Sequence, residues 1–113
     1  MTTIYHNPRC RKSRETLELI TSKRESPNIV EYLKTPPNYE ELAGIVDLLG
    51  IKPLALIRRN EKVFKEQFKG QDLSDEEWLN VMIENPILIE RPVVVKDGKA
   101  TIGRPPESVL DIL

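Results

Sequence analysis

The chain has 113 residues with 17 Lys or Arg and 18 Asp or Glu, and its formal net charge of −1 at pH 7 gives no reason to expect binding to nucleic acid or to anionic membranes. The length fits one domain, and the single cysteine excludes an internal disulfide and a zinc or iron–sulfur ligand set, so we expect no metal and no bound cofactor. The sequence has no apolar signal segment and no run long enough to span a bilayer, which favours a cytoplasmic protein.

The first predicted elements surround the only cysteine and the only histidine of the chain. Residues 2–5 are predicted to form a strand, Asn7-Pro8 a turn, and residues 11–23, which contain no Gly or Pro, a helix. Cys10 therefore lies at a strand–loop–helix junction, where unpaired backbone N–H groups and the helix dipole favour an anion. We expect this position to lower the pKa of the thiol.

Side chains next to Cys10 are expected to strengthen this effect. Ser13 lies one helical turn after Cys10 and can donate its hydroxyl hydrogen to the sulfur. His6 would add positive charge only below its pKa of about 6.5, so its effect should be smaller than that of the arginines. A lone cysteine is often a small buried hydrophobe, but here the basic flank and the turn favour a reactive thiol. The flanking cations are Arg9, Arg11, Lys12 and Arg14.

The next segments predict a β-α-β unit followed by a helix. Residues 29–33 have the composition of a strand, which the crossover helix would make parallel to the first strand. Asn38 and Glu41 have the spacing of a capping box, and apolar residues at helical spacing follow them as far as Leu49. Gly50 then suits the left-handed position that ends a helix.

Further helical pieces are predicted between Gly50 and Pro86. Pro53 suits the first turn of a helix that runs into the adjacent arginines Arg58 and Arg59. A short helical piece follows at residues 63–68, and Ser74 with Glu77 forms a second capping box before a helix that ends near residue 84. These pieces would form a helical insertion at about residues 38–85.

The last third of the chain predicts a hairpin and a short helix. The three valines of residues 93–95 favour a buried strand, and Asp97-Gly98 is a strong signal for a two-residue turn. Residues 99–102 would return as an antiparallel strand, and residues 107–113 as a helix. The order predicts an α/β fold of the thioredoxin-like plan in one domain, 1–113, with a four-stranded mixed sheet built as βαβ and then ββα.

Four blocks of sequence together resemble the glutaredoxin-coupled arsenate reductase family over essentially the whole chain. They are His6-Asn7-Pro8-Arg9-Cys10 with Ser13-Arg14, then Ile57-Arg58-Arg59-Asn60, Glu90-Arg91-Pro92-Val93-Val94-Val95, and Gly103-Arg104-Pro105-Pro106-Glu107. The resemblance implies that Cys10 attacks the arsenic of arsenate, that glutathione reacts with the adduct as co-substrate, and that glutaredoxin resolves the mixed disulfide. It also implies that Arg58, Arg91 and Arg104 bind the oxyanion, with His6 and Ser13 in supporting roles.

Physical chemistry agrees with these roles, because an arginine fork binds two oxygens of a tetrahedral oxyanion at once. The preference for Arg58 over Arg59 rests on the resemblance alone. In thioredoxin-like proteins the proline beside the active-site sulfur is cis, so we predict a cis bond between Arg91 and Pro92.

Two other functions fit parts of the same sequence. A monothiol oxidoreductase that exchanges glutathione with protein cysteines would keep Cys10 but need fewer arginines. A non-enzymatic redox regulator that binds RNA polymerase would usually carry a CxxC pair, whereas here Ser13 stands in the second position. With Ser13 there, Cys10 needs an external thiol to be resolved, which favours glutathione.

Overall fold

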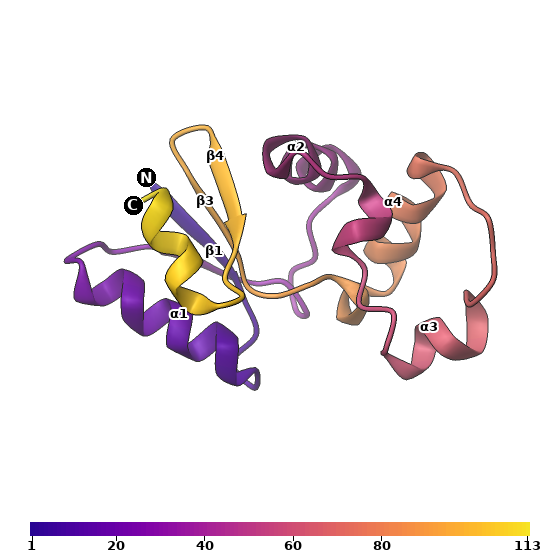
Figure 1. The fold of residues 1–113 in the computed structure, drawn as a ribbon, viewed down its shortest axis with the longest axis horizontal. Helices are drawn as coiled ribbons and strands as arrows, with labels where there is room; N and C mark the ends of the chain where they lie inside the picture. The colour runs from indigo at the N-terminus through magenta and orange to yellow at the C-terminus, as the bar shows by residue number, and fades with distance from the viewer. The chain divides into compact units, whose positions relative to one another are not determined.

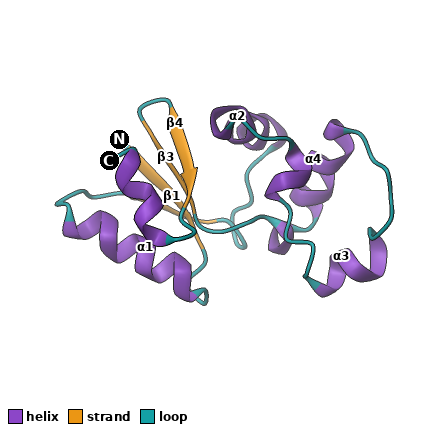
Figure 2. Cartoon of the chain, viewed as in Figure 1, coloured by secondary structure: helices purple, strands orange, loops and turns teal.

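The computed structural model describes residues 1–113, which divide into two compact units (Figure 1). The sheet unit consists of residues 1–35 and 91–113, and the helical unit consists of residues 36–90. All four strands belong to the sheet unit (Figure 2). That the whole chain is one domain with a helical insertion at about residues 38–85 stays a prediction. No helix combines the length and the apolar character that crossing a membrane requires.

The sheet unit has the predicted topology. Its strand order is β2-β1-β3-β4, with β1 parallel to β2 and antiparallel to β3, and β3 antiparallel to β4. The mixed sheet, built as βαβ and then ββα, is therefore confirmed. The elements are β1 (Thr2–His6), α1 (Arg11–Ser22), β2 (Asn28–Glu31), β3 (Val93–Lys96), β4 (Lys99–Ile102) and the 3-10 helix η3 (Pro106–Asp111).

The core of the sheet unit joins both segments of the chain that form it. Ile4 of β1, Ile20 of α1 and Val94 of β3 are fully buried together with Val109 of η3. Each such side chain contributes roughly 1.5–3 kcal/mol by leaving water. Helices α1 and η3 pack against each other beside the sheet (Figure 1). This packing fixes the start of α1, which follows Cys10, relative to the start of β3, which follows Arg91.

Two turns bring β3 and β4 into position. Asp97 and Gly98 have φ values of 49° and 77°, so the predicted two-residue hairpin turn is confirmed. At the other end of β4, a Cβ atom on Gly103 would lie 2.5 Å from Thr16 Oγ1 and 2.8 Å from Pro92 Cγ. Only glycine fits there, and its close approach to α1 sets where the next residue, Arg104, leaves the sheet.

The helical unit contains both predicted capping boxes. Asn38 Oδ1 accepts from the Glu41 N–H at 2.8 Å, and Ser74 Oγ accepts from the Glu77 N–H at 3.2 Å. Gly50 ends the first of these helices with φ 67°, as predicted. The elements are α2 (Tyr39–Leu49), η1 (Pro53–Leu56), α3 (Lys62–Gln67), α4 (Asp75–Glu84) and η2 (Pro86–Leu88).

Three predicted elements differ in length or type. The segment at Pro53 is a single 3-10 turn, because Ile57 is extended and pairs with Ile89 instead of continuing the helix. The C-terminal helix is also 3-10, with the Ser108 N–H bonded to the Pro105 carbonyl. The second strand ends at Glu31, because the Glu31 carbonyl accepts from the N–H groups of a turn at residues 34 and 35.

Candidate active site

Cys10 is the N-cap residue of α1. Its backbone is extended, with φ −91° and ψ 122°, and its carbonyl accepts the first helical hydrogen bond from the Arg14 N–H at 3.0 Å. Its own N–H donates to the Asn7 carbonyl at 3.0 Å, which closes the preceding turn. The side chain is partly exposed. The sulfur therefore stands, as predicted, at the positive end of a helix dipole.

Buried polar side chains hold the loop before Cys10. Ser13 Oγ accepts from the Asn7 N–H at 3.0 Å and lies 2.6 Å from His6 Nδ1. All three residues are buried. Because these two contacts engage the hydroxyl, the prediction that Ser13 donates it to the sulfur is wrong. The backbone N–H of Ser13 instead favours the Cys10 thiolate. The contacts of Ser13 with His6 and Asn7 hold the loop before Cys10, and a supporting role of His6 and Ser13 in the reaction stays a prediction.

Two distant arginines meet at the sulfur. Arg104 Nη2 lies 3.5 Å from Cys10 Sγ, and Arg104 Nε donates to the Arg91 carbonyl at 2.8 Å. The Arg91 side chain hydrogen-bonds to the same sulfur. The predicted cis bond between Arg91 and Pro92 is confirmed, and the bond between Arg104 and Pro105 is also cis, which the sequence analysis did not foresee. Two of the three predicted anion-binding arginines are thus gathered around Cys10.

The surroundings of Cys10 lower the pKa of its thiol. Partial burial raises this pKa, but four effects outweigh it: the Ser13 N–H, the hydrogen bond from Arg91, and the positive charges of Arg91 and Arg104. The predicted direction is therefore confirmed. A larger fraction of Cys10 is thiolate at neutral pH than in a free cysteine, and the thiolate is the nucleophilic form.

The cations next to Cys10 in sequence are not the ones that lower its pKa. Arg11 pairs with Glu15 at 3.4 Å, and Arg14 Nη1 donates to the Pro8 carbonyl at 3.0 Å. Burial lowers the pKa of His6, the nearby Glu31 raises it and Arg14 lowers it, for a net decrease. His6 is therefore neutral at pH 7. The expectation that His6 contributes less than the arginines agrees with this result. The expectation that the flanking cations lower the pKa of the thiol is wrong, because the positive charge comes from Arg91 and Arg104.

The third predicted arginine, Arg58, belongs to the helical unit. The Arg58 N–H bonds to the Leu88 carbonyl at 2.8 Å, which holds Arg58 beside Glu90. Its Nη1 lies 2.7 Å from Glu90 Oε1, and its Nε lies 3.1 Å from Glu61 Oε2. Burial lowers the pKa of Arg58, and these hydrogen bonds raise it by more. Two carboxylates thus already balance its charge, and its role as an oxyanion ligand stays a prediction.

The rate at which Cys10 is alkylated by iodoacetamide should show the lowered pKa. Because only the thiolate reacts, the rate rises as pH passes the pKa, so we expect a midpoint below the value of about 8.5 for a free thiol. The Arg104→Gln variant removes a positive charge 3.5 Å from the sulfur. Its midpoint should therefore move to higher pH.

The matched control for this measurement is Arg11→Gln, because Arg11 is close to Cys10 in sequence but pairs with Glu15. It should leave the midpoint where it is. A midpoint at or above that of a free thiol, or equal shifts in the two variants, would contradict this account of the site.

The sequence matches a known protein family over nearly its whole length. The model of the ArsC family matches residues 5–112. The chain belongs to the ArsC family. The resemblance found in the sequence is therefore confirmed, and the match includes Cys10 and all three predicted arginines.

Individual relatives of this ArsC-family chain align over nearly its whole length. It is 46% identical over 112 residues to a protein of Escherichia coli K12 called "Uncharacterized protein YfgD", with 97% of this chain and 94% of that one covered. It is 42% identical to an arsenate reductase of Escherichia coli K12, covering 98% of this chain and 79% of that one. The solved arsenate reductase of Vibrio cholerae superposes with a TM-score of 0.96 at 46% identity, covering 99% and 97% of the two chains.

Proposed function

We propose that this chain is an arsenate reductase in which the Cys10 thiolate attacks arsenic. The observation that carries the proposal is the meeting of Arg91 and Arg104 at the sulfur of an N-cap cysteine with a lowered pKa. Its relatives at 42% and 46% identity that are named arsenate reductase support it. A thiol that only exchanged glutathione would have less need of two guanidinium groups at its sulfur.

The two arginines would perform two tasks in this reaction. Arsenate is an anion with tetrahedrally arranged oxygens, and guanidinium N–H groups bind such oxygens in pairs. The attack also brings a thiolate toward an anion, so positive charge that is already in place lowers the barrier. Arg58 would be a third ligand by family resemblance, but its two carboxylates make it the weakest of the three.

The proposed chemistry balances with two external thiols. Cys10 forms a sulfur–arsenic bond, and one arsenate oxygen leaves as water after protonation, with arsenic still pentavalent. The glutathione thiol then attacks the sulfur of the adduct: a sulfur–sulfur bond forms, the sulfur–arsenic bond breaks, and its electron pair stays on arsenic, which becomes trivalent and leaves as arsenite. Glutaredoxin attacks the glutathione sulfur of this mixed disulfide, which forms a disulfide between glutaredoxin and glutathione and releases the Cys10 thiolate.

The need for external thiols follows from the composition of the chain. Cys10 is its only cysteine, so no second thiol of the same chain can displace the group bound to its sulfur. We therefore propose glutathione as co-substrate and glutaredoxin as protein partner, without a bound cofactor.

A coupled assay tests this function. Oxidation of NADPH is followed with arsenate, glutathione, glutathione reductase and glutaredoxin, and each component is omitted in turn. We expect turnover that requires arsenate, glutathione and glutaredoxin together. Turnover that is absent with arsenate but present with a glutathionylated peptide would overturn the proposal in favour of glutathione exchange.

A further inference from the structure

A pocket in the helical unit lies among α3, α4 and the segments beside them. It has a volume of about 370 Å³, and its lining includes the rings of Phe64, Phe68 and Trp78. That volume falls within the range typical of small-molecule sites in proteins, roughly 300–1,000 Å³. Every lining residue belongs to the helical unit, and Cys10 is not among them.

Three aromatic rings form one wall of this pocket. The ring centroids of Phe64 and Trp78 are 5.9 Å apart in a stacked arrangement, and Phe68 packs edge-on against Trp78 at 6.4 Å. Phe64 and Trp78 are buried, whereas Phe68 is partly exposed. Phe68 therefore supplies the accessible ring of this wall, and the buried rings of Phe64 and Trp78 pack against it and hold it in place.

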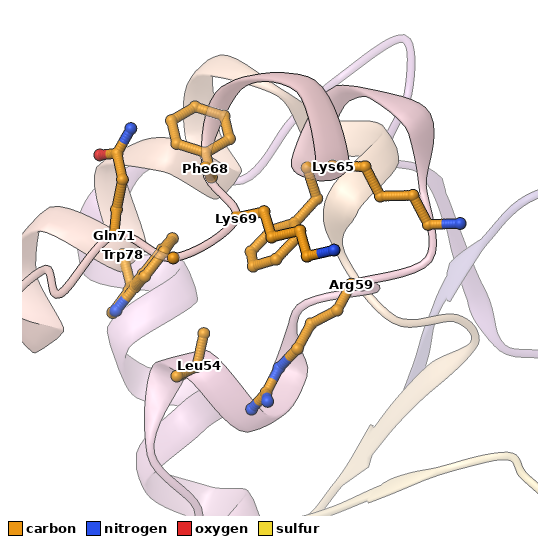
Figure 3. Close-up of a pocket in the computed structure, with 9 residues that line it drawn as sticks. Leu54, Arg59, Lys65, Phe68, Lys69, Gln71 and Trp78 are labelled. Carbon is orange, nitrogen blue, oxygen red and sulfur yellow. The ribbon is translucent and has the colours of Figure 1, made fainter.

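Positive charge surrounds the opening. The lining includes Arg59, Lys65 and Lys69 and no carboxylate. Figure 3 shows that Lys69 and Arg59 extend into the space that Trp78, Phe68 and Leu54 border. None of the three cations takes part in an ion pair of the structure, whereas Lys62, on the same helix α3 as Lys65, pairs with Glu66 at 3.6 Å.

The adjacent arginines thus have opposite surroundings. Arg58 is held between two carboxylates, whereas Arg59 lines a pocket that contains no carboxylate. Because Arg59 and Lys69 are exposed, each contributes only modestly to the binding of an anion, and the two contributions combine. The complementary ligand therefore combines a flat apolar body with a negative charge.

We propose that this pocket binds small aromatic anions, with the rings of the ligand against the partly exposed Phe68 and its carboxylate, sulfonate or phosphate group between Arg59 and Lys69. This binding is independent of the chemistry at Cys10 and of the proposed reductase function. It adds to the chain a second ligand site that selects for charge and for aromatic shape together.

Trp78 provides a direct readout, because it is the only tryptophan of the chain. Its indole N–H therefore gives one peak in a two-dimensional NMR spectrum of the nitrogen-labelled protein. Titration with naphthoate should shift this peak saturably. Naphthamide, which has the same shape without the charge, should bind at least about fivefold more weakly, as expected when contacts to two exposed cations are lost. Inorganic sulfate, which has charge without an aromatic body, should not shift the peak.

Variants separate the pocket from general surface charge. Lys69→Gln and Arg59→Gln should each weaken naphthoate binding, and the double variant should weaken it by about fivefold or more. Lys62→Gln removes a lysine of the neighbouring helix α3 that does not line the pocket, and should leave the affinity unchanged. The proposal is overturned if naphthoate causes no saturable shift, if naphthamide binds equally well, or if the Lys62 control loses as much affinity as the double variant.

Discussion

The Cys10→Ser variant is expected to lose arsenate-dependent turnover by at least about a thousandfold, to the limit of detection. A serine hydroxyl stays protonated at neutral pH, and His6, the only histidine, cannot serve as its base because Nδ1 lies 2.6 Å from Ser13 Oγ and the ring is buried. The serine variant also cannot form the sulfur–arsenic adduct that the proposed reduction requires, because it has no sulfur at this position. The coupled NADPH assay measures this loss.

The Cys10→Ser variant should still bind arsenate, so that a loss of chemistry can be distinguished from a loss of structure. Arg91 and Arg104 remain in the variant, and Arg104 stays anchored because Nε donates to the Arg91 carbonyl. Calorimetric titration with arsenate should therefore give an affinity close to that of the unchanged protein, and thermal unfolding should show a similar midpoint. Turnover by the serine variant above a small fraction of the original rate would mean that Cys10 is not the nucleophile.

The second large effect is expected at Arg91. Replacement by alanine removes a hydrogen bond and a positive charge from the sulfur, and with them an oxyanion ligand in the proposed reaction. We expect kcat/KM for arsenate to fall by about a hundredfold to a thousandfold, in line with the loss of one preorganised donor to a charged transition state. Arg91→Lys should recover only part of this loss, because an ammonium group is a point charge that lacks the planar fork.

Two measurements distinguish this role of Arg91 from a structural one. The alkylation midpoint of Cys10 should rise in Arg91→Ala, and added guanidinium ion should restore part of the turnover. Arg11→Ala is the matched control, since Arg11 pairs with Glu15 at the surface and should change neither quantity. Full activity in Arg91→Lys would show that charge alone is sufficient and that the fork geometry has no role.

Side-chain and backbone contributions of Arg91 can be separated as well. Its carbonyl holds Arg104, and this contact persists whatever side chain stands at position 91. Because both guanidinium groups act on one sulfur, the effects of Arg91→Ala and Arg104→Ala should not add in the double variant.

Local signals in the sequence were sufficient for most of the fold. The capping boxes that begin at Asn38 and Ser74 and the hairpin at Asp97-Gly98 depend on side chains within three residues of each other, and all three are present. The 3-10 turn at Pro53 was not predictable in this way. It ends where Ile57 pairs with Ile89, a partner 32 positions away whose register the apolar pattern does not specify.

In the candidate site, too, the sequence predicted only what neighbouring residues determine. The position of Cys10 at a helix start followed from its neighbours, but the source of the charge did not. Proximity in sequence suggested the flanking cations Arg9, Arg11, Lys12 and Arg14. All four are exposed, and Arg11 and Arg14 contact Glu15 and the Pro8 carbonyl instead of the sulfur. Family resemblance indicated Arg91 and Arg104, and for Arg91 its place before Pro92 at the start of a buried strand agreed with it. No local pattern shows which loop of a sheet meets a given helix, and the close approach of Gly103 to Thr16 had no sequence signal either.

The discontinuity of the sheet unit has a consequence for the newly made protein. Cys10 leaves the ribosome early, while Arg104 follows 94 residues later, and β3 must reach β1 before Arg91 comes to the sulfur. Until then the thiol has only the start of its own helix to stabilise its anionic form. A nascent or truncated chain that lacks Arg91 and Arg104 therefore carries a less reactive thiol, and Cys10 gains its full nucleophilic strength only once both arginines have reached it.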